Sequence, residues 1–158
     1  GAANEVAVPG DPACRKCPNG WRPVVDHSDC ESCEPGFVGD GLGAKCLACA
    51  PGTYTPREGL TKCTVCPAGM VTKTAGLSFC ERCGAGEQAV NQHRECKTCP
   101  DGTYADPWGI DCVPCPAEGV NCIDGLLSLK DGFWLGPDAD YESTFGPGVI
   151  GQLSTAGR

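Results

Sequence analysis

The hydrophobic positions of this chain recur with the spacing of a repeat and not with that of a helix. No window places apolar residues at i, i+3, i+4 and i+7 over three turns, and frequent Gly and Pro would interrupt any helix. Apolar residues instead follow a Pro/Gly turn signal by one or two positions, as Trp21, Phe37, Tyr54, Val71 and Tyr104 do. Each repeat therefore predicts a turn leading into a short strand, and the chain predicts little helix.

The cysteines follow the same period. Seven Cys-x-x-Cys pairs recur every 16 or 17 residues, with 12 or 13 residues between successive pairs. A glycine stands three residues after each of the first six pairs and four residues after the last. A fixed period of this length indicates a repeat array, whose weakest unit has Glu87-Gln88 where the others have an apolar residue. The pairs begin at Cys14, Cys30, Cys46, Cys63, Cys80, Cys96 and Cys112.

The two ends of the chain differ from the repeats at 14–122. Residues 1–13 have neither Cys nor periodicity and are interpreted as a linker. After Cys122 an apolar stretch is centred on Asp131-Gly132, and Asp-Gly is a strong turn signal, so 123–135 predicts a terminal β-hairpin. Residues 136–158, rich in Gly and Pro and without Cys, are interpreted as a flexible tail or partner-binding segment.

The amino-acid composition indicates that disulfides, and not a conventional hydrophobic core, stabilise the fold. Leu, Ile, Val and Phe together number 27 of 158 residues, about 17%, while the chain has 15 Cys and 37 Gly plus Pro. These proportions predict a small disulfide-rich fold in an oxidising compartment, so we expect an extracellular or cell-surface protein. Because each unit is tied only to its neighbours, the fold expected is an elongated array of short β-hairpins and irregular repeats.

The net charge of the chain limits the classes of binding partner to be expected. The net charge of −8 argues against nucleic acid and against an anionic membrane surface, which leaves protein as the expected partner. No apolar run approaches 18 residues and no basic-then-apolar N-terminus is present, so we expect neither direct membrane insertion nor a signal peptide within these residues. No Asn-x-Ser/Thr sequon occurs, whereas Thr55-Pro56 and the Ser and Thr residues elsewhere leave O-glycosylation open.

Three chemistries compete for the cysteines. Zinc sites would prefer wider gaps between the pairs and an even number of pairs. Redox centres would need a helix N-terminus to lower the thiol pKa, and no helix pattern lies near any pair. A disulfide framework agrees with the spacing and the weak core, so no cofactor is expected.

Other polar clusters are weak candidates. Asp26-His27-Ser28-Asp29 contains the residue types of a catalytic triad, but sequence neighbours cannot adopt triad geometry. Asp26, Asp29 and Glu31 could suggest calcium, although the acidic spacing of calcium-binding modules is missing. We therefore expect a protein that is not an enzyme.

The repeat motif resembles known extracellular modules. The segment Cys33-Glu34-Pro35-Gly36-Phe37 up to Cys46 is similar to the last loop of EGF-like modules, and more closely to that of laminin-type EGF repeats. The tandem form from Cys49 to Gly69 resembles the cysteine-rich repeats of ephrin receptors and of tumour-necrosis-factor-receptor-like ectodomains. Similar arrays occur in large extracellular proteins of protists and algae, including mastigoneme-type filament proteins. The resemblance covers about residues 14–135 and implies a fold far more than an activity.

The resemblance also implies a disulfide pairing, in which the Cys before each Pro-Gly turn bonds to the next Cys along the chain. Cys14 is then left for a bridge to upstream chain, a bridge to another molecule, or a free thiol. Crossed pairs, as in furin-like modules, are the alternative. The implied pairs are Cys17–Cys30, Cys33–Cys46, Cys49–Cys63, Cys66–Cys80, Cys83–Cys96, Cys99–Cys112 and Cys115–Cys122.

Two functional classes follow. The first is a non-enzymatic extracellular structural module, a disulfide-stapled rod for cell-surface or filament assembly; the alternative is the ligand-binding ectodomain stalk of a cell-surface receptor. Apolar residues after the last Cys have no disulfide core to cover them, so we expect them to dock on another copy or on another extracellular protein. These interaction candidates are Leu127, Leu129, Phe133, Trp134, Phe145, Val149 and Ile150.

Overall fold

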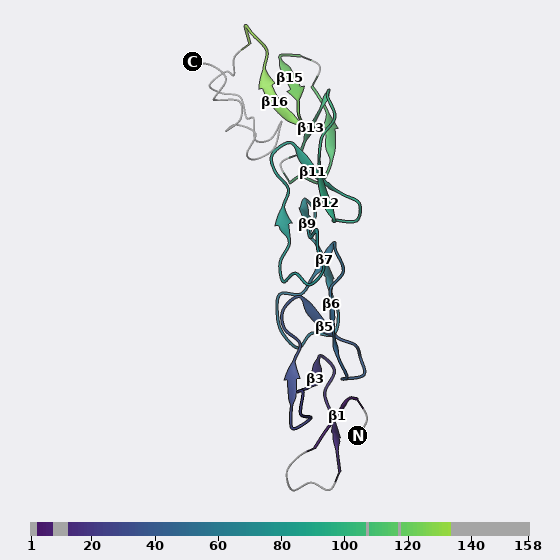
Figure 1. The fold of residues 1–158 in the computed structure, drawn as a ribbon. Coiled ribbons are helices and arrows are strands. Elements are labelled where there is room, and N and C mark those ends of the chain that lie inside the picture. Colours follow the sequence, from purple (N-terminus) through teal and green to yellow (C-terminus); the bar gives the residue numbers. More distant parts are fainter. Residues whose placement is uncertain (1–2, 8–12, 107, 117, 134–158) are drawn as a thin grey trace. The chain divides into compact units, whose positions relative to one another are not determined.

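The protein is built from short strands, as the sequence predicts. A computed structural model describes residues 3–7, 13–106, 108–116 and 118–133, and these contain sixteen strands and no helix (Figure 1). The small disulfide-rich fold of β-hairpins is therefore confirmed. The strands are β1 (Glu5–Val6), β2 (Arg15–Lys16), β3 (Trp21–Pro23), β4 (Cys30–Ser32), β5 (Phe37–Gly39), β6 (Cys46–Ala48), β7 (Thr53–Tyr54), β8 (Thr64–Val65), β9 (Met70–Val71), β10 (Glu81–Arg82), β11 (Glu87–Val90), β12 (Glu95–Thr98), β13 (Thr103–Ala105), β14 (Cys112–Pro114), β15 (Val120–Ile123) and β16 (Leu126–Leu129).

Each strand pairs with its neighbour in sequence, which gives eight two-stranded sheets. The hairpin β5–β6 is typical: Phe37 pairs with Ala48 and Gly39 with Cys46, in antiparallel register. One cysteine precedes the first strand and the other lies in or beside the second strand. The disulfide Cys33–Cys46 therefore closes the loop that the hairpin opens.

Backbone hydrogen bonds join each repeat to the next. The N–H of Cys33, which begins one repeat, donates to the carbonyl oxygen of Gly20 in the repeat before it, at 2.8 Å. The Cys and Gly of the recurring Cys-x-x-Gly motif therefore form backbone hydrogen bonds between repeats, in addition to the disulfide that the Cys forms. The same bond recurs as Cys49 to Gly36, Cys66 to Gly52, Cys83 to Gly69, Cys99 to Gly86 and Cys115 to Gly102, each between 2.9 and 3.0 Å.

The chain divides into two compact units, one of Gly1–Pro67 with Val71–Glu81 and the other of Ala68–Met70 with Arg82–Arg158. In the first unit the most buried side chains are those of Cys33, Cys49, Thr55, Val71 and Thr72. In the second unit a small cluster of Val120, Cys122 and Leu127 is packed by Tyr104, Cys115 and Leu129. Neither unit has the extended apolar core of an ordinary globular domain, in agreement with the composition.

The repeat array begins earlier in the chain than the sequence predicts. Glu5 and Val6 form β1, which pairs with Lys16 and Arg15 of β2. The N–H of Cys17 donates to the carbonyl oxygen of Asn4 at 3.0 Å, so Asn4 occupies the place that glycine has in later repeats. This segment is part of a repeat, and the prediction of a plain linker is wrong for residues 4–6.

The terminal hairpin is also placed differently. Strands β15 and β16 turn at Asp124-Gly125, and Ile123 pairs with Leu126, so the hairpin is not centred on Asp131-Gly132. Asp124 and Gly125 have φ of 52° and 73°, the two positive values that a tight type I′ hairpin turn requires. The upstream turn prevails because it brings Leu127 opposite Cys122, where both are buried.

Candidate functional site

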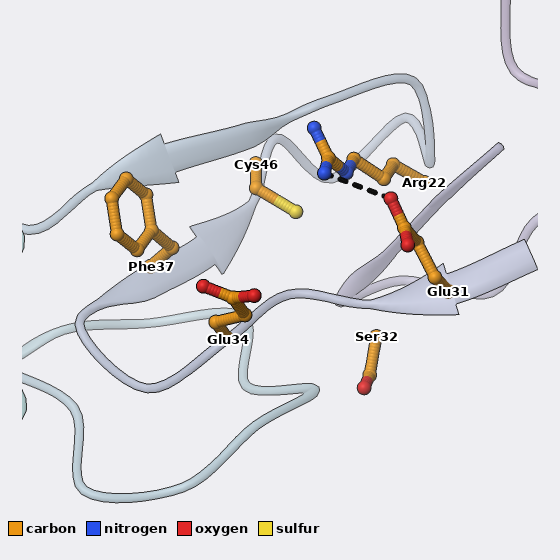
Figure 2. Close-up of a pocket in the computed structure, with 6 residues that line it drawn as sticks. All are labelled: Arg22, Glu31, Ser32, Glu34, Phe37 and Cys46. Atoms are coloured by element: carbon orange, nitrogen blue, oxygen red, sulfur yellow. Dashed lines mark ion pairs between the residues drawn. The ribbon is translucent and has the colours of Figure 1, made fainter. Parts of the chain in front are cut away.

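A pocket of about 260 Å³ lies in the first unit, beside the hairpins β3–β4 and β5–β6 (Figure 2). Figure 2 shows the Glu34 carboxylate and the Cys46 sulfur in the space between the ring of Phe37 and an ion pair. The lining residues come from two successive repeats, so the pocket exists only once the repeats have packed. They are Arg22, Glu31, Ser32, Glu34, Phe37 and Cys46.

The ion pair joins Arg22 to Glu31. These residues face each other across strands β3 and β4, and Arg22 Nη2 lies 2.8 Å from Glu31 Oε1. Their side chains are 52% and 45% exposed, so solvent screening limits the pair to about 1 kcal/mol or less of stability. Its main effect is on geometry, because it fixes both charged groups at one edge of the pocket.

The opposite edge consists of Phe37 and Glu34. The N–H of Phe37 donates to the carbonyl oxygen of Glu34 at 3.0 Å, which sets the turn between them. The Phe37 ring lies against Gly76, since a Cβ atom on that glycine would be 3.2 Å from the ring Cζ. The Glu34 side chain is exposed and has no ion-pair partner in the described part of the chain. Its carboxylate is therefore available at the pocket.

The base of the pocket is fixed from two directions. The disulfide Cys33–Cys46 lies beneath it, and Cys33 is only 1% exposed. Ser32 Oγ donates to Glu58 Oε2 at 2.7 Å. This bond holds the Cys49–Cys63 loop, which belongs to the repeat after the two that line the pocket, beside the pocket. One guanidinium and two carboxylates line the pocket, so its formal charge is −1.

The structure contains seven disulfides, all between cysteines successive in the chain. Their Cα–Cα distances are 5.5 to 5.8 Å, within the usual range for a disulfide. Cys14 is exposed and has no disulfide partner among the described residues. The bonded pairs are Cys17–Cys30, Cys33–Cys46, Cys49–Cys63, Cys66–Cys80, Cys83–Cys96, Cys99–Cys112 and Cys115–Cys122.

The apolar interaction candidates do not form one exposed strand. Leu127 is only 3% exposed and packs with Val120 and Cys122, so the expectation that no disulfide core covers it is wrong. Leu129 is partly buried against the same cluster, whereas Phe133 is 55% exposed. The fold of β16 back onto the last disulfide explains the difference. The remaining candidates, Trp134, Phe145, Val149 and Ile150, lie outside the described residues.

The triad-type residues are used in a turn. Ser28 Oγ and the Ser28 N–H donate to Asp26 Oδ1 at 2.6 and 3.0 Å, and these bonds lower the pKa of the Asp26 carboxyl. The Asp29 carboxylate accepts from the Cys30 N–H at 2.8 Å. His27 Nδ1 lies 2.8 Å from the carbonyl oxygen of Glu5 and not beside Ser28. Within the described ranges, no three His, Cys, Asp or Glu side chains are grouped so as to hold a metal ion.

Sequence reasoning missed two buried threonines. Thr55 and Thr72 are 0% and 1% exposed, so the expectation that Thr55 is open to O-glycosylation is wrong. Thr55 Oγ1 accepts from the Gly36 N–H at 2.9 Å, and Thr72 Oγ1 accepts from the Gly52 N–H at 2.6 Å. Both stand three residues after the glycine of their own repeat, where Gly39, Ala89 and Ala105 stand in others. Aligning the repeats would have shown that this position takes mostly small residues, with Pro23 as an exception.

Both histidines have a related structural role that was also missed. His93 Nδ1 lies 3.1 Å from the carbonyl oxygen of Met70, much as His27 contacts Glu5 in an earlier repeat. Each histidine has positive φ, 57° and 62°, and stands ten residues after the first Cys of its repeat. Other repeats have glycine at that position, as at Gly59 and Gly76. The histidines therefore brace one repeat against the preceding one.

Comparison with known proteins finds two to which the repeats are similar. A family model described as "Tyrosine-protein kinase ephrin type A/B receptor-like" matches residues 40–83. Sushi, von Willebrand factor type A, EGF and pentraxin domain-containing protein 1 of Rattus norvegicus is 31% identical over 119 residues, which are 74% of this chain. The chain spans only 3% of that relative's length. In the part of this chain that the structure covers, no helix is long and apolar enough to cross a membrane. The chain is thus similar to ephrin-receptor-like cysteine-rich repeats and to a small portion of a much larger protein whose name includes EGF.

Proposed function

We propose that this chain is a non-enzymatic extracellular structural module, a disulfide-stapled repeat array used in cell-surface or filament assembly. The observation that carries this proposal is the continuity of the bonding between repeats. Each repeat has its own disulfide, and the N–H of its first Cys donates to the glycine carbonyl of the repeat before it. Cysteine and glycine, the residues that define the motif, therefore both take part in connecting the repeats.

The polar side chains support the same interpretation. Asp26, Ser28 and Asp29 satisfy their own turn, and His27 and His93 bond to backbone carbonyls of a neighbouring repeat. These groups stabilise the array and are not arranged around a shared reaction centre. The disulfide content further supports an oxidising, extracellular location.

A second function is a ligand-binding ectodomain stalk of a cell-surface receptor. It is favoured by the match of residues 40–83 to a family model described as ephrin-receptor-like. It is also favoured by the pocket beside Phe37, which is a concave feature of mixed charge on the first unit. In this alternative the array would hold a binding surface at a distance from a membrane.

Electron microscopy of the native material, with light scattering over a concentration series, tests the choice. Ordered fibres or concentration-dependent oligomers, formed without reductant, are the result expected of a structural module. Monomers at every concentration that retain a soluble protein partner would instead favour the receptor stalk. Both proposals would be overturned if the purified chain turned over a substrate and a point substitution that leaves the chain folded abolished that activity.

A further inference from the structure

We propose that the pocket bounded by Phe37, Glu34 and the Arg22–Glu31 pair receives the cationic side chain, lysine or arginine, of a partner protein. The inference rests on the proposed function in one respect, namely that the chain acts by binding protein. It goes further because it assigns a site and the chemistry of the group that enters it.

The charge of the pocket selects a cation. Arg22 is already paired with Glu31 at 2.8 Å, so its guanidinium is partly neutralised. Glu34 has no such partner among the described residues, and the Glu58 carboxylate lies just beyond Ser32. The chain as a whole carries −8, which adds a long-range attraction for cations and repulsion for anions. A partner's carboxylate would be repelled by this negative charge, and the only arginine that lines the pocket, Arg22, is already paired with Glu31.

The apolar surfaces suit the rest of a lysine or arginine side chain. The Phe37 ring offers a face to a cation, an interaction that contributes about 0.5–1 kcal/mol at exposed sites. The Cys33–Cys46 disulfide provides apolar surface for the methylene groups that separate the charge from the partner's backbone. Metal ions would gain nothing from these apolar walls.

The size of the pocket points to a side chain and not to a free cofactor. Its volume of about 260 Å³ lies below the range of about 300–1,000 Å³ that is usual for sites of drug-sized ligands. A single long side chain, anchored by the rest of a protein partner, needs less enclosure than a free small molecule does. The pocket therefore fits one anchor residue within a larger interface.

The pocket is held in shape before any partner arrives. Phe37 is packed against Gly76, the Arg22–Glu31 pair spans two paired strands, and Ser32 is bonded to Glu58. A preformed site loses little conformational entropy on binding, which raises the affinity available from a small contact.

NMR titration of the full ¹⁵N-labelled chain tests the proposal. The cationic probes are N-acetyl-arginine amide and N-acetyl-lysine amide; the neutral control is N-acetyl-citrulline amide, and the anionic control is N-acetyl-glutamate amide. We expect saturable shifts of the backbone amides of residues 31–37 and of Cys46 with the cationic probes, and weaker, non-saturating shifts with the two controls.

Matched variants identify the groups responsible. Glu34→Gln should weaken binding of the arginine probe about threefold or more, because it removes the unpaired carboxylate without changing its shape. Asp101→Asn is the control, since Asp101 is an exposed acidic residue that precedes the glycine of another repeat, in the second unit. Phe37→Leu should also weaken binding, while the amide spectrum of this variant stays unchanged outside the pocket and the Gly76 loop that the ring contacts.

The proposal is overturned if citrulline and arginine probes give equal shifts, if the glutamate probe binds more tightly, or if Glu34→Gln leaves the arginine affinity unchanged. These outcomes are independent of whether the chain assembles. Loss of the fibres or oligomers expected of the structural module would leave the probe titration intact, so the two proposals can fail separately.

Discussion

Gly36 and Gly76 lie so close that a Cβ atom on Gly36 would overlap the carbonyl oxygen of Gly76. Gly36 ends the turn before β5, whereas Gly76 belongs to the disulfide loop two repeats further along the chain. Gly20 has the same relation to Gly59 within the same unit. These two repeats are therefore each in contact with the second repeat after them as well as with their immediate neighbour, and glycine is what allows this approach.

Gly36→Ala should destabilise the fold more than Gly41→Ala does. Both glycines have positive φ, 89° and 78°, so alanine carries backbone strain of roughly 1–2 kcal/mol at either position. Gly41 faces open space, however, whereas alanine at 36 would force the Gly76 backbone away. Denaturant unfolding without reductant measures the difference, and equal losses for the two variants would show that the contact between alternate repeats is not stabilising.

Thr72→Val tests the buried hydroxyls. Valine keeps the shape of threonine but removes the Oγ1 that accepts from the Gly52 N–H and donates to the carbonyl oxygen of Thr53 at 3.2 Å. The Gly52 N–H keeps its bond to the Thr72 carbonyl oxygen at 3.0 Å, so the loss of the hydroxyl bonds should cost about 1 kcal/mol. Thr64→Val, at an exposed position of β8, is the matched control and should change the unfolding free energy little. A loss for Thr72→Val no larger than for the control would contradict the role given to the hydroxyl.

The sequence predicts what is local and misses what depends on packing between repeats. Disulfide-rich hairpins follow from the composition, from the turn signal within each repeat and from the period of the cysteines along the chain. The tight turn at Asp124-Gly125 could not be chosen over Asp131-Gly132 because the two signals are the same; burial of Leu127 against Cys122 decides between them.

The pocket, too, could not be predicted from the sequence. Arg22 and Glu31 belong to one repeat and Glu34 and Phe37 to the next, so no single motif contains the site. Its existence depends on the packing of two hairpins and on the contact of Phe37 with Gly76. A repeat alignment finds positions that must be small, but it cannot find a cavity formed between variable surface residues.

Non-reducing peptide mapping should recover each Cys linked to the next along the chain, with Cys14 alone alkylated. Cys33–Cys46 and Cys49–Cys63 are the most informative links, because a crossed scheme would replace both. A thiol titration of the folded chain should find one reactive group per molecule, at the exposed Cys14. Recovery of Cys14–Cys30 together with Cys17–Cys33 would refute the sequential pairing.

The hydrogen bonds in the Asp26 turn predict how this carboxyl group titrates at low pH. The Ser28 hydroxyl and N–H favour the charged form of Asp26, so its pKa in the folded chain is lower than the usual 3.8. A lowered folded-state pKa means that the contribution to stability is present above the unfolded-state value and is lost as pH falls through the folded-state value. Carboxyl NMR shifts should give a midpoint below 3.8 for Asp26, and Ser28→Ala should raise it. An unchanged midpoint in Ser28→Ala would contradict the assigned cause.

Two truncations separate the roles of the chain after Cys122. Ending the chain after Cys122 removes β16 and Leu127, which leaves Val120 and Cys122 uncovered, so the last repeat should lose protease resistance. Ending it after Phe133 keeps that hairpin, and the N–H of Lys130 can still donate to the carbonyl oxygen of Gly119 at 3.0 Å. If residues 134–158 dock on another copy, the longer truncation product should keep the repeats folded and lose concentration-dependent assembly. Limited proteolysis and light scattering measure the two properties separately. Assembly that persists without residues 134–158 would place the contact elsewhere, and Phe133, which is 55% exposed, would then be the next residue to substitute.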